Sequence, residues 1–156
     1  MRIVIAGQTY YPATNGAAVF TIQLAEGLAR VGHQVTVLVP SDRGRAYHVR
    51  SNGVIIHGVG ALALRPFYPD IHVTVRARRP VGLLLDETRP EVVHIQDHWP
   101  LSRAVLHEAM ERDLPLVGTN NFLPDNIVPQ VPVLARRRTL LDRIVWKTVL
   151  DVFNRV

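Results

Sequence analysis

The chain has 156 residues, no cysteine and a formal net charge of +5. That length suits one domain with a core of its own, and the lack of cysteine excludes disulfides and thiolate metal sites. No apolar run is long enough for a membrane span, and Met1-Arg2 leads into a strand pattern rather than a signal peptide. We therefore expect a soluble, cytoplasmic protein, and the positive charge indicates an anionic partner such as a nucleotide or a phospholipid.

The first 31 residues predict a strand over 2–7, a long loop and an amphipathic helix over about 16–31. The loop is longer than a strand-to-helix connection needs, which favours a functional role. At the carboxyl edge of a parallel sheet, a helix N-terminus suits a phosphate or sugar oxygen. We predict an anion-binding loop at Asn15, Gly16 and Ala17, and the alternative is that Asn15 only caps the helix.

Strand patterns alternate with helical patterns along the rest of the chain, which is typical of a parallel α/β sheet. We expect further strands at 34–39, 53–59, 91–95 and 115–119, and further helices at about 80–88, 100–112 and 133–156. Residues 60–79 leave room for a short strand. The pattern predicts an α/β fold, a doubly wound parallel sheet with helices on both faces and strand order 3-2-1-4-5.

The helix expected at 133–156 has an apolar stripe, and basic residues lie opposite it. We expect the stripe to be mostly core, because helices must cover both faces of such a sheet. The stripe consists of Leu134, Leu141, Ile144, Val145, Val149, Val152, Phe153 and Val156. Basic residues here and near residue 78 are candidate contacts with an anion or a membrane surface: Arg76, Arg78, Arg79, Arg136, Arg143 and Lys147.

The predicted strand order puts a switch point between the first and fourth strands, where ligands bind in such folds. The loops there carry amide, carboxylate and imidazole groups beside Trp99, a set that suits a polyhydroxylated ligand. The candidate acceptor-binding residues are Gln8, Tyr10, Gln96, His98, Trp99, Asn120, Asp125 and Asn126. Alternatively, Asp97 only caps the helix near Pro100, and Trp99 and His94 belong to the core.

Several common sites are missing from the sequence. There is no G-x-G-x-x-G fingerprint, no P-loop lysine and no G-x-S-x-G elbow. His94 and His98 leave a strand rather than sharing a helix face, so zinc is not expected. Positive charge without a recognition motif does not support a nucleic-acid partner. We therefore expect no cofactor, no metal and no nucleic acid.

Several segments together resemble one known family: the loop with Pro12 and Asn15-Gly16-Ala17, LARVGHQVTVLVP, EVVHIQDHWPLSRAV and PLVGTNNFLPDN. They are similar to the N-terminal domain of family 4 (group 1) retaining glycosyltransferases, which have the two-domain glycosyltransferase-B fold. The resemblance covers nearly all of the chain. It looks nearest to the branch of the diacylglycerol glucosyltransferases and phosphatidylinositol mannosyltransferases.

The resemblance implies that residues 1–156 are an acceptor-binding, Rossmann-like N-terminal domain. A second domain, absent from this chain, would bind most of the nucleotide sugar, and transfer in the cleft between them would need no metal. The family's glycine-rich loop against the donor phosphates matches Gly16-Ala17, where a Gly-Gly pair is usual. Its histidine near the reacting centre matches Asn121, so Asn121 and Asp97 are the candidate catalytic residues, although an amide cannot shuttle protons.

Two functions follow from this sequence. The first is the acceptor half of a transferase that moves a sugar to an acceptor hydroxyl, and one form of this hypothesis has a lipid as the acceptor. Because the donor domain is missing, we expect the chain alone to be inactive. The second is a stand-alone binding or assembly module whose basic helix face, Arg136, Arg137, Arg138, Arg143 and Lys147, meets a membrane or a partner. A lipid acceptor would add peripheral attachment to the inner face of the membrane.

Overall fold

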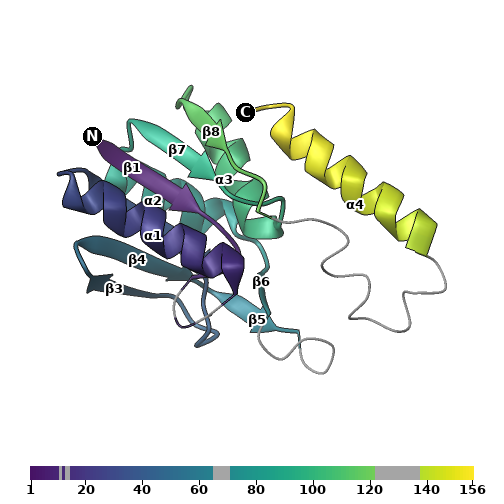
Figure 1. The fold of residues 1–156 in the computed structure, drawn as a ribbon, viewed down its shortest axis with the longest axis horizontal. Coiled ribbons are helices and arrows are strands. Elements are labelled where there is room, and N and C mark those ends of the chain that lie inside the picture. The colour runs from purple at the N-terminus through teal and green to yellow at the C-terminus, as the bar shows by residue number, and fades with distance from the viewer. Residues whose placement is uncertain (11, 13–14, 65–70, 122–137) are drawn as a thin grey trace.

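The computed structural model describes residues 1–10, 12, 15–64, 71–121 and 138–156, with side chains from residue 143 onward in the last segment. A six-stranded sheet forms the centre, and helices lie on both of its faces (Figure 1). This arrangement confirms the expected α/β fold.

Five strands of the sheet are parallel, and those in the middle of it are buried. The five strands are β1 (Arg2–Ala6), β2 (Gln34–Pro40), β4 (Val54–Val59), β7 (Val92–Ile95) and β8 (Leu116–Gly118). Their order is β4-β2-β1-β7-β8, with Ile3 paired to Val35 on one side and to Val92 on the other. The predicted order 3-2-1-4-5 is confirmed. It places the ends of β1 and β7 side by side.

The sheet also contains an edge strand that the sequence analysis did not predict. Strand β3 (Tyr47–Ser51) runs antiparallel to β4 and extends the sheet beyond it. The two strands are joined by Asn52-Gly53, which have φ of 48° and 81°. Both residues of the tightest hairpin turn need positive φ, which Asn and Gly adopt readily. The Asn-Gly pair was therefore a hairpin signal that the sequence analysis missed.

The segment without a clear sequence pattern holds two short strands. β5 (Ala61–Ala63) and β6 (His72–Thr74) pair antiparallel in a separate two-stranded ribbon. The carbonyl of His72 accepts a hydrogen bond from the Gln8 side chain at 2.6 Å. The ribbon is thereby attached to the loop that follows β1.

In the described part of the chain, four helices cover the sheet: α1 (Gly16–Arg30), α2 (Arg78–Thr88), α3 (Pro100–Met110) and α4 (Arg138–Phe153). Helix α1 packs on one face, against a cluster that includes Ile3 and Ile5. The other three helices contribute to a second cluster that includes Val4 and Ala6. Side chains alternate between the faces along β1, so burial on both faces accounts for its continuous apolar run.

The expectation that the α4 stripe is mostly core holds only near the helix C-terminus. Val149 and Val152 are buried, whereas Ile144 is 53% exposed. Helix α4 lies at the end of its layer, beyond β8 and α3 (Figure 1), so only one narrow side reaches the core. Phe153 packs against Gly118, where an added Cβ would lie 2.9 Å from its ring. Leu134 lies outside the described residues, as does the side chain of Leu141.

Candidate functional site

The carboxyl ends of β1, β7 and β8 meet at one edge of the sheet. The Gln96 amide donates to the Ala6 carbonyl at 3.0 Å, and the Asn121 amide donates to the Gln96 carbonyl at 3.2 Å. These bonds join residues that follow three different strands. The structure therefore brings together the loops predicted to form the switch point, and it does so through the backbone.

The carboxylate of Asp97 links two of these loops. It is buried, its Oδ2 accepts a hydrogen bond from the Gln8 amide at 2.5 Å, and its Oδ1 accepts one from the Trp99 amide at 3.0 Å. Burial raises the pKa of Asp97, and the N–H donors oppose that shift. Both oxygens already hold backbone donors, so Asp97 is placed to fix the loops rather than to meet a substrate. The alternative that Asp97 caps α3 is not what the structure shows, because that helix has no side-chain cap and the carboxylate bonds the Trp99 amide before the first turn.

Three amide side chains at this edge keep unused hydrogen-bonding capacity. Among the described residues, Oε1 of Gln8, Nε2 of Gln96 and Nδ2 of Asn121 are buried and have no partner. One comes from the end of each of the three strands. Buried polar groups in folded proteins are nearly always satisfied, so three exceptions at one edge require an explanation.

Thr21 of α1 belongs to this edge, although the sequence analysis missed it. Its side chain is 1% exposed, and its hydroxyl contacts both the Ala17 carbonyl, at 2.8 Å, and the side-chain amide of Gln96. Gln96 is itself only 2% exposed. The sequence signal that could have identified Thr21 is a hydroxyl on the apolar, core-facing side of a predicted helix.

The N-terminus of α1 has the features of an anion-binding turn. The side chain of Asn15 caps the helix by accepting a hydrogen bond from the Ala18 amide at 2.9 Å. At Gly16, no atom of the described residues lies within 4 Å of where a Cβ would be. The capping role of Asn15 is confirmed, and the helix opens at Gly16 without crowding.

Tyr10 does not join the edge. It is buried in the cluster under α1, and burial, together with the Glu26 carboxylate, raises its pKa to about 12.

His94 is partly buried on β7 and bonds to the Thr119 hydroxyl at 2.8 Å, which agrees with the alternative that His94 belongs to the core. Burial lowers the pKa of His94, and burial together with Arg103 lowers that of His98. Both imidazoles are therefore mainly neutral at pH 7.

The remaining candidates differ in exposure. Asn120 is exposed, and Trp99 is partly buried at the residue before Pro100, where α3 begins. Asp125 and Asn126, like Arg136, lie outside the described residues. Among the described residues, no three acidic, histidine or cysteine side chains are grouped so as to hold a metal ion.

The predicted basic contacts fall into two groups. Arg76, Arg79, Arg143 and Lys147 are exposed. Arg78 instead forms ion pairs with Glu108 at 2.9 Å and Glu111 at 2.8 Å, so its charge is balanced. Arg76 and Arg78 line a hollow of about 770 Å³ between α2, α3 and α4. Its apolar lining comes mainly from Ala104, Leu106, Met110 and Val152.

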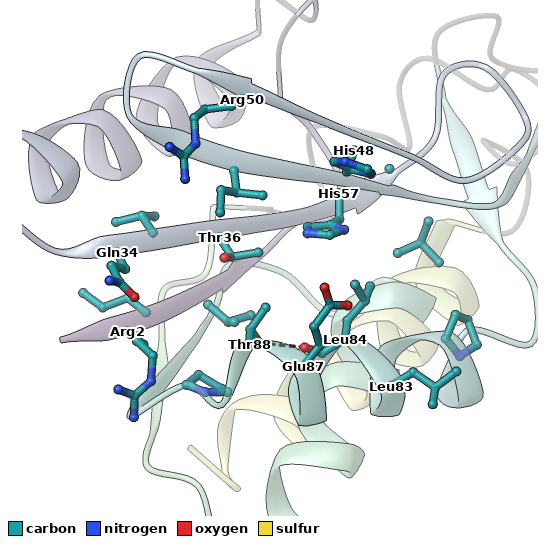
Figure 2. A pocket seen from close by; sticks show the side chains of 18 of the residues that line it. Arg2, Gln34, Thr36, His48, Arg50, His57, Leu83, Leu84, Glu87 and Thr88 are labelled. Carbon is teal, nitrogen blue, oxygen red and sulfur yellow. Dashed lines mark hydrogen bonds between the residues drawn. The ribbon is translucent and has the colours of Figure 1, made fainter.

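A larger groove, of about 980 Å³, lies away from the carboxyl edge, between α2 and the strands β4 and β3. Figure 2 shows His57 and Glu87 pointing toward one another across it, with Thr36 on its floor. The rings of His48 and His57 stack at 5.8 Å. Burial lowers the pKa of His57, the Glu87 carboxylate opposes this shift, and His48 adds to it. The sequence analysis placed no site here.

Comparison with known proteins gives the family. Residues 14–156 match the model of Glycosyltransferase Family 4. A GDP-mannose-dependent alpha-mannosyltransferase of Mycolicibacterium smegmatis is 29% identical over 120 residues, which are 76% of this chain and 32% of that protein. The alpha-monoglucosyldiacylglycerol synthase of Acholeplasma laidlawii is 28% identical over 121 residues, 76% of this chain and 29% of that protein. The chain thus spans about a third of the length of these relatives.

A solved structure supports the fold. The sucrose-phosphate synthase of Thermosynechococcus elongatus superimposes with a TM-score of 0.57 and 15% identity, over 92% of this chain and 39% of that one. At this identity the likeness concerns the fold alone, and it agrees with the Rossmann-like sheet described above. Because the family model matches nearly the whole sequence, the chain belongs to glycosyltransferase family 4.

Proposed function

We propose that this chain is the acceptor-binding part of a retaining, metal-independent glycosyltransferase that moves a sugar from a nucleotide sugar to an acceptor hydroxyl. The observation that carries the proposal is the carboxyl edge of β1, β7 and β8. Its amide side chains on Gln8 and Asn121 have unused hydrogen-bonding atoms, and they lie on the same edge as an uncrowded helix N-terminus at Gly16. Such groups suit hydroxyls and phosphate oxygens.

The chain alone is expected to be inactive. One helix N-terminus supplies only part of the contacts that a leaving diphosphate needs, and most of the donor site would lie in a second domain. Calorimetric titration with uridine and guanosine diphosphate sugars tests this expectation. We expect weak binding and no turnover. Micromolar affinity for any donor would show that the main donor site lies in this chain.

We propose further that the acceptor is a lipid, held at the cytoplasmic face of a membrane. The hollow between α2, α3 and α4 supports this, because apolar side chains line it and Arg76 is exposed there, whereas Arg103 and Arg155 pair with Asp151. One relative is by name a synthase of a glucosyldiacylglycerol. No helix in the described part of the chain is long and apolar enough to cross a membrane.

Cosedimentation with vesicles tests the lipid proposal. We expect binding to anionic vesicles that weakens with salt and falls when Arg76 and Arg79 are both changed to Ala, since each basic residue contributes about 1 kcal/mol near an anionic surface. The matched control changes Arg30 and Arg50, which are exposed on α1 and β3. Equal binding to neutral and anionic vesicles, or none to either, would favour a soluble acceptor. Tight binding to a protein partner, without any sugar ligand, would favour the assembly module.

A further inference from the structure

At the buried contact between Thr21 and Gln96, the hydrogen-bond acceptors outnumber the donor protons that face them. The Thr21 hydroxyl is within hydrogen-bond distance of the Ala17 carbonyl, at 2.8 Å, and of Oε1 of Gln96, while Nε2 of Gln96 has no partner among the described residues. A hydroxyl has one proton and cannot donate to both oxygens. With Oε1 of Gln96 facing Thr21, and the Thr21 proton donated to Ala17, the short contact joins two acceptor oxygens. The N–H donors on Nε2 of Gln96 are then buried without a partner among the described residues.

Turning the Gln96 amide by half a rotation removes both defects. Its nitrogen then donates to the Thr21 hydroxyl oxygen, and the hydroxyl donates to the Ala17 carbonyl. The nitrogen and oxygen of an amide have nearly the same shape, so its orientation is chosen by the hydrogen bonds it can make. An unpaired buried carbonyl oxygen also remains more often in proteins than an unpaired N–H.

With this orientation, hydrogen bonds together with the covalent side chain of Gln96 form a continuous path. It starts at the Ala17 carbonyl in the first turn of α1, passes through Thr21 and the Gln96 side chain, and leaves through the Gln96 backbone. There the Gln96 carbonyl accepts from the Asn121 amide at 3.2 Å. The path therefore connects the predicted phosphate loop to the residue that matches the family's histidine.

We propose that Thr21 and Gln96 are positioning residues that fix the phosphate loop relative to Asn121. Both are almost fully buried, so they act through Ala17 and Asn121 rather than by touching a ligand. The proposal rests on the proposed function in taking Gly16 and Ala17 as the phosphate-binding turn.

Nuclear magnetic resonance of the 156-residue chain tests the orientation directly. Side-chain amide protons of Gln96 should show nuclear Overhauser contacts to the β and methyl protons of Thr21. Absence of those contacts would overturn the proposed orientation. This measurement needs no ligand, so its result is independent of the proposed transferase activity.

Titration with inorganic pyrophosphate tests the positioning role. In the wild type we expect shifts of the Gly16 and Ala17 amide signals and, through this path, of Gln96 and Asn121. Thr21→Val should keep the first pair of shifts and lose the second, while Thr21→Ser should retain all four. Thr88→Val is the matched control, because Thr88 also donates to a carbonyl one turn earlier, that of Leu84 at 2.7 Å.

Each result decides one of the two proposals. Loss of the Asn121 shift in Thr21→Val alone supports the positioning role, and its retention there, or an equal loss in Thr88→Val, overturns it. If Thr21→Val does not fold, Gln96→Met serves instead, because a thioether has no N–H for Thr21, is similar in size and uncharged, and should also remove the Asn121 shift. If pyrophosphate leaves Gly16 and Ala17 unchanged in the wild type, the phosphate assignment is wrong, and the Overhauser contacts alone decide the orientation.

Discussion

The carboxyl edge of β1, β7 and β8 and the groove beside α2 are both polar, but they hold their polar groups differently. At the edge, buried side chains are fixed by backbone hydrogen bonds, as Asp97 is by the amides of Gln8 and Trp99. In the groove, which is the larger hollow, His48 and Arg50 project from an exposed edge strand. Volume alone therefore does not indicate the functional site. The way in which polar groups are held is the better guide, because preorganisation requires fixed neighbours.

The largest effect that would sharpen this comparison is expected at Asp97. In Asp97→Ala the buried amides of Gln8 and Trp99 lose their acceptor, which costs about 1–3 kcal/mol for each unsatisfied donor. Urea unfolding measures the loss. Asp97→Asn is the control, because it keeps one carbonyl oxygen and should lose less. Unchanged stability in the alanine variant would mean that the edge is not held by this carboxylate.

A smaller effect is expected in the groove region. An added Cβ at Gly58 would overlap the ring of Tyr47, so Gly58→Ala must displace a ring that also contacts the Arg43 guanidinium at 4.3 Å. Overpacking of this kind costs about 1–3 kcal/mol, and the partly exposed ring can move toward solvent, which places the effect at the low end. Repeating the substitution in a Tyr47→Ala background should remove most of the loss. Full additivity would contradict the proposed clash.

At the first turn of α1, Asn15→Ala removes the side-chain oxygen that caps the Ala18 amide. Loss of such a cap costs about 1 kcal/mol. Chemical unfolding should show this decrease, and Asn15→Asp should restore most of it because the carboxylate is also a good cap. If the alanine and aspartate variants are equally stable, the cap does not contribute to the stability of the fold.

The smallest effect compares histidines of the two regions. Burial lowers the pKa of His94 at the edge and of His57 in the groove below 6.5, so the unfolded chain binds more protons than the folded one as the pH falls through that value. Stability should therefore decrease on acidification below about pH 6.5. His94→Gln should flatten the decrease more than His57→Gln, because Glu87 offsets part of the shift at His57. If the free energy of unfolding changes with pH to the same extent in both variants and the wild type, neither histidine contributes to the loss of stability in acid.

The sequence by itself determined the parallel strand order, the position of α1 and the meeting of the β1 and β7 loops. Apolar periodicity and right-handed crossovers fix these features locally. The cap at Asn15 was also predictable, since it depends on neighbouring backbone groups. The Asn52-Gly53 hairpin could have been predicted too, because the turn signal lies within two residues.

Only the tertiary structure decided which polar residues act together. Thr21 and Gln96 are 75 positions apart, and no local pattern relates them. Tyr10 lies in the core and Arg78 is neutralised by Glu108 and Glu111, although each looked like a surface contact in the sequence. Ile144 is exposed because α4 reaches the core along one narrow side. Periodicity specifies the apolar side of an element, but what covers that side depends on how the layers pack.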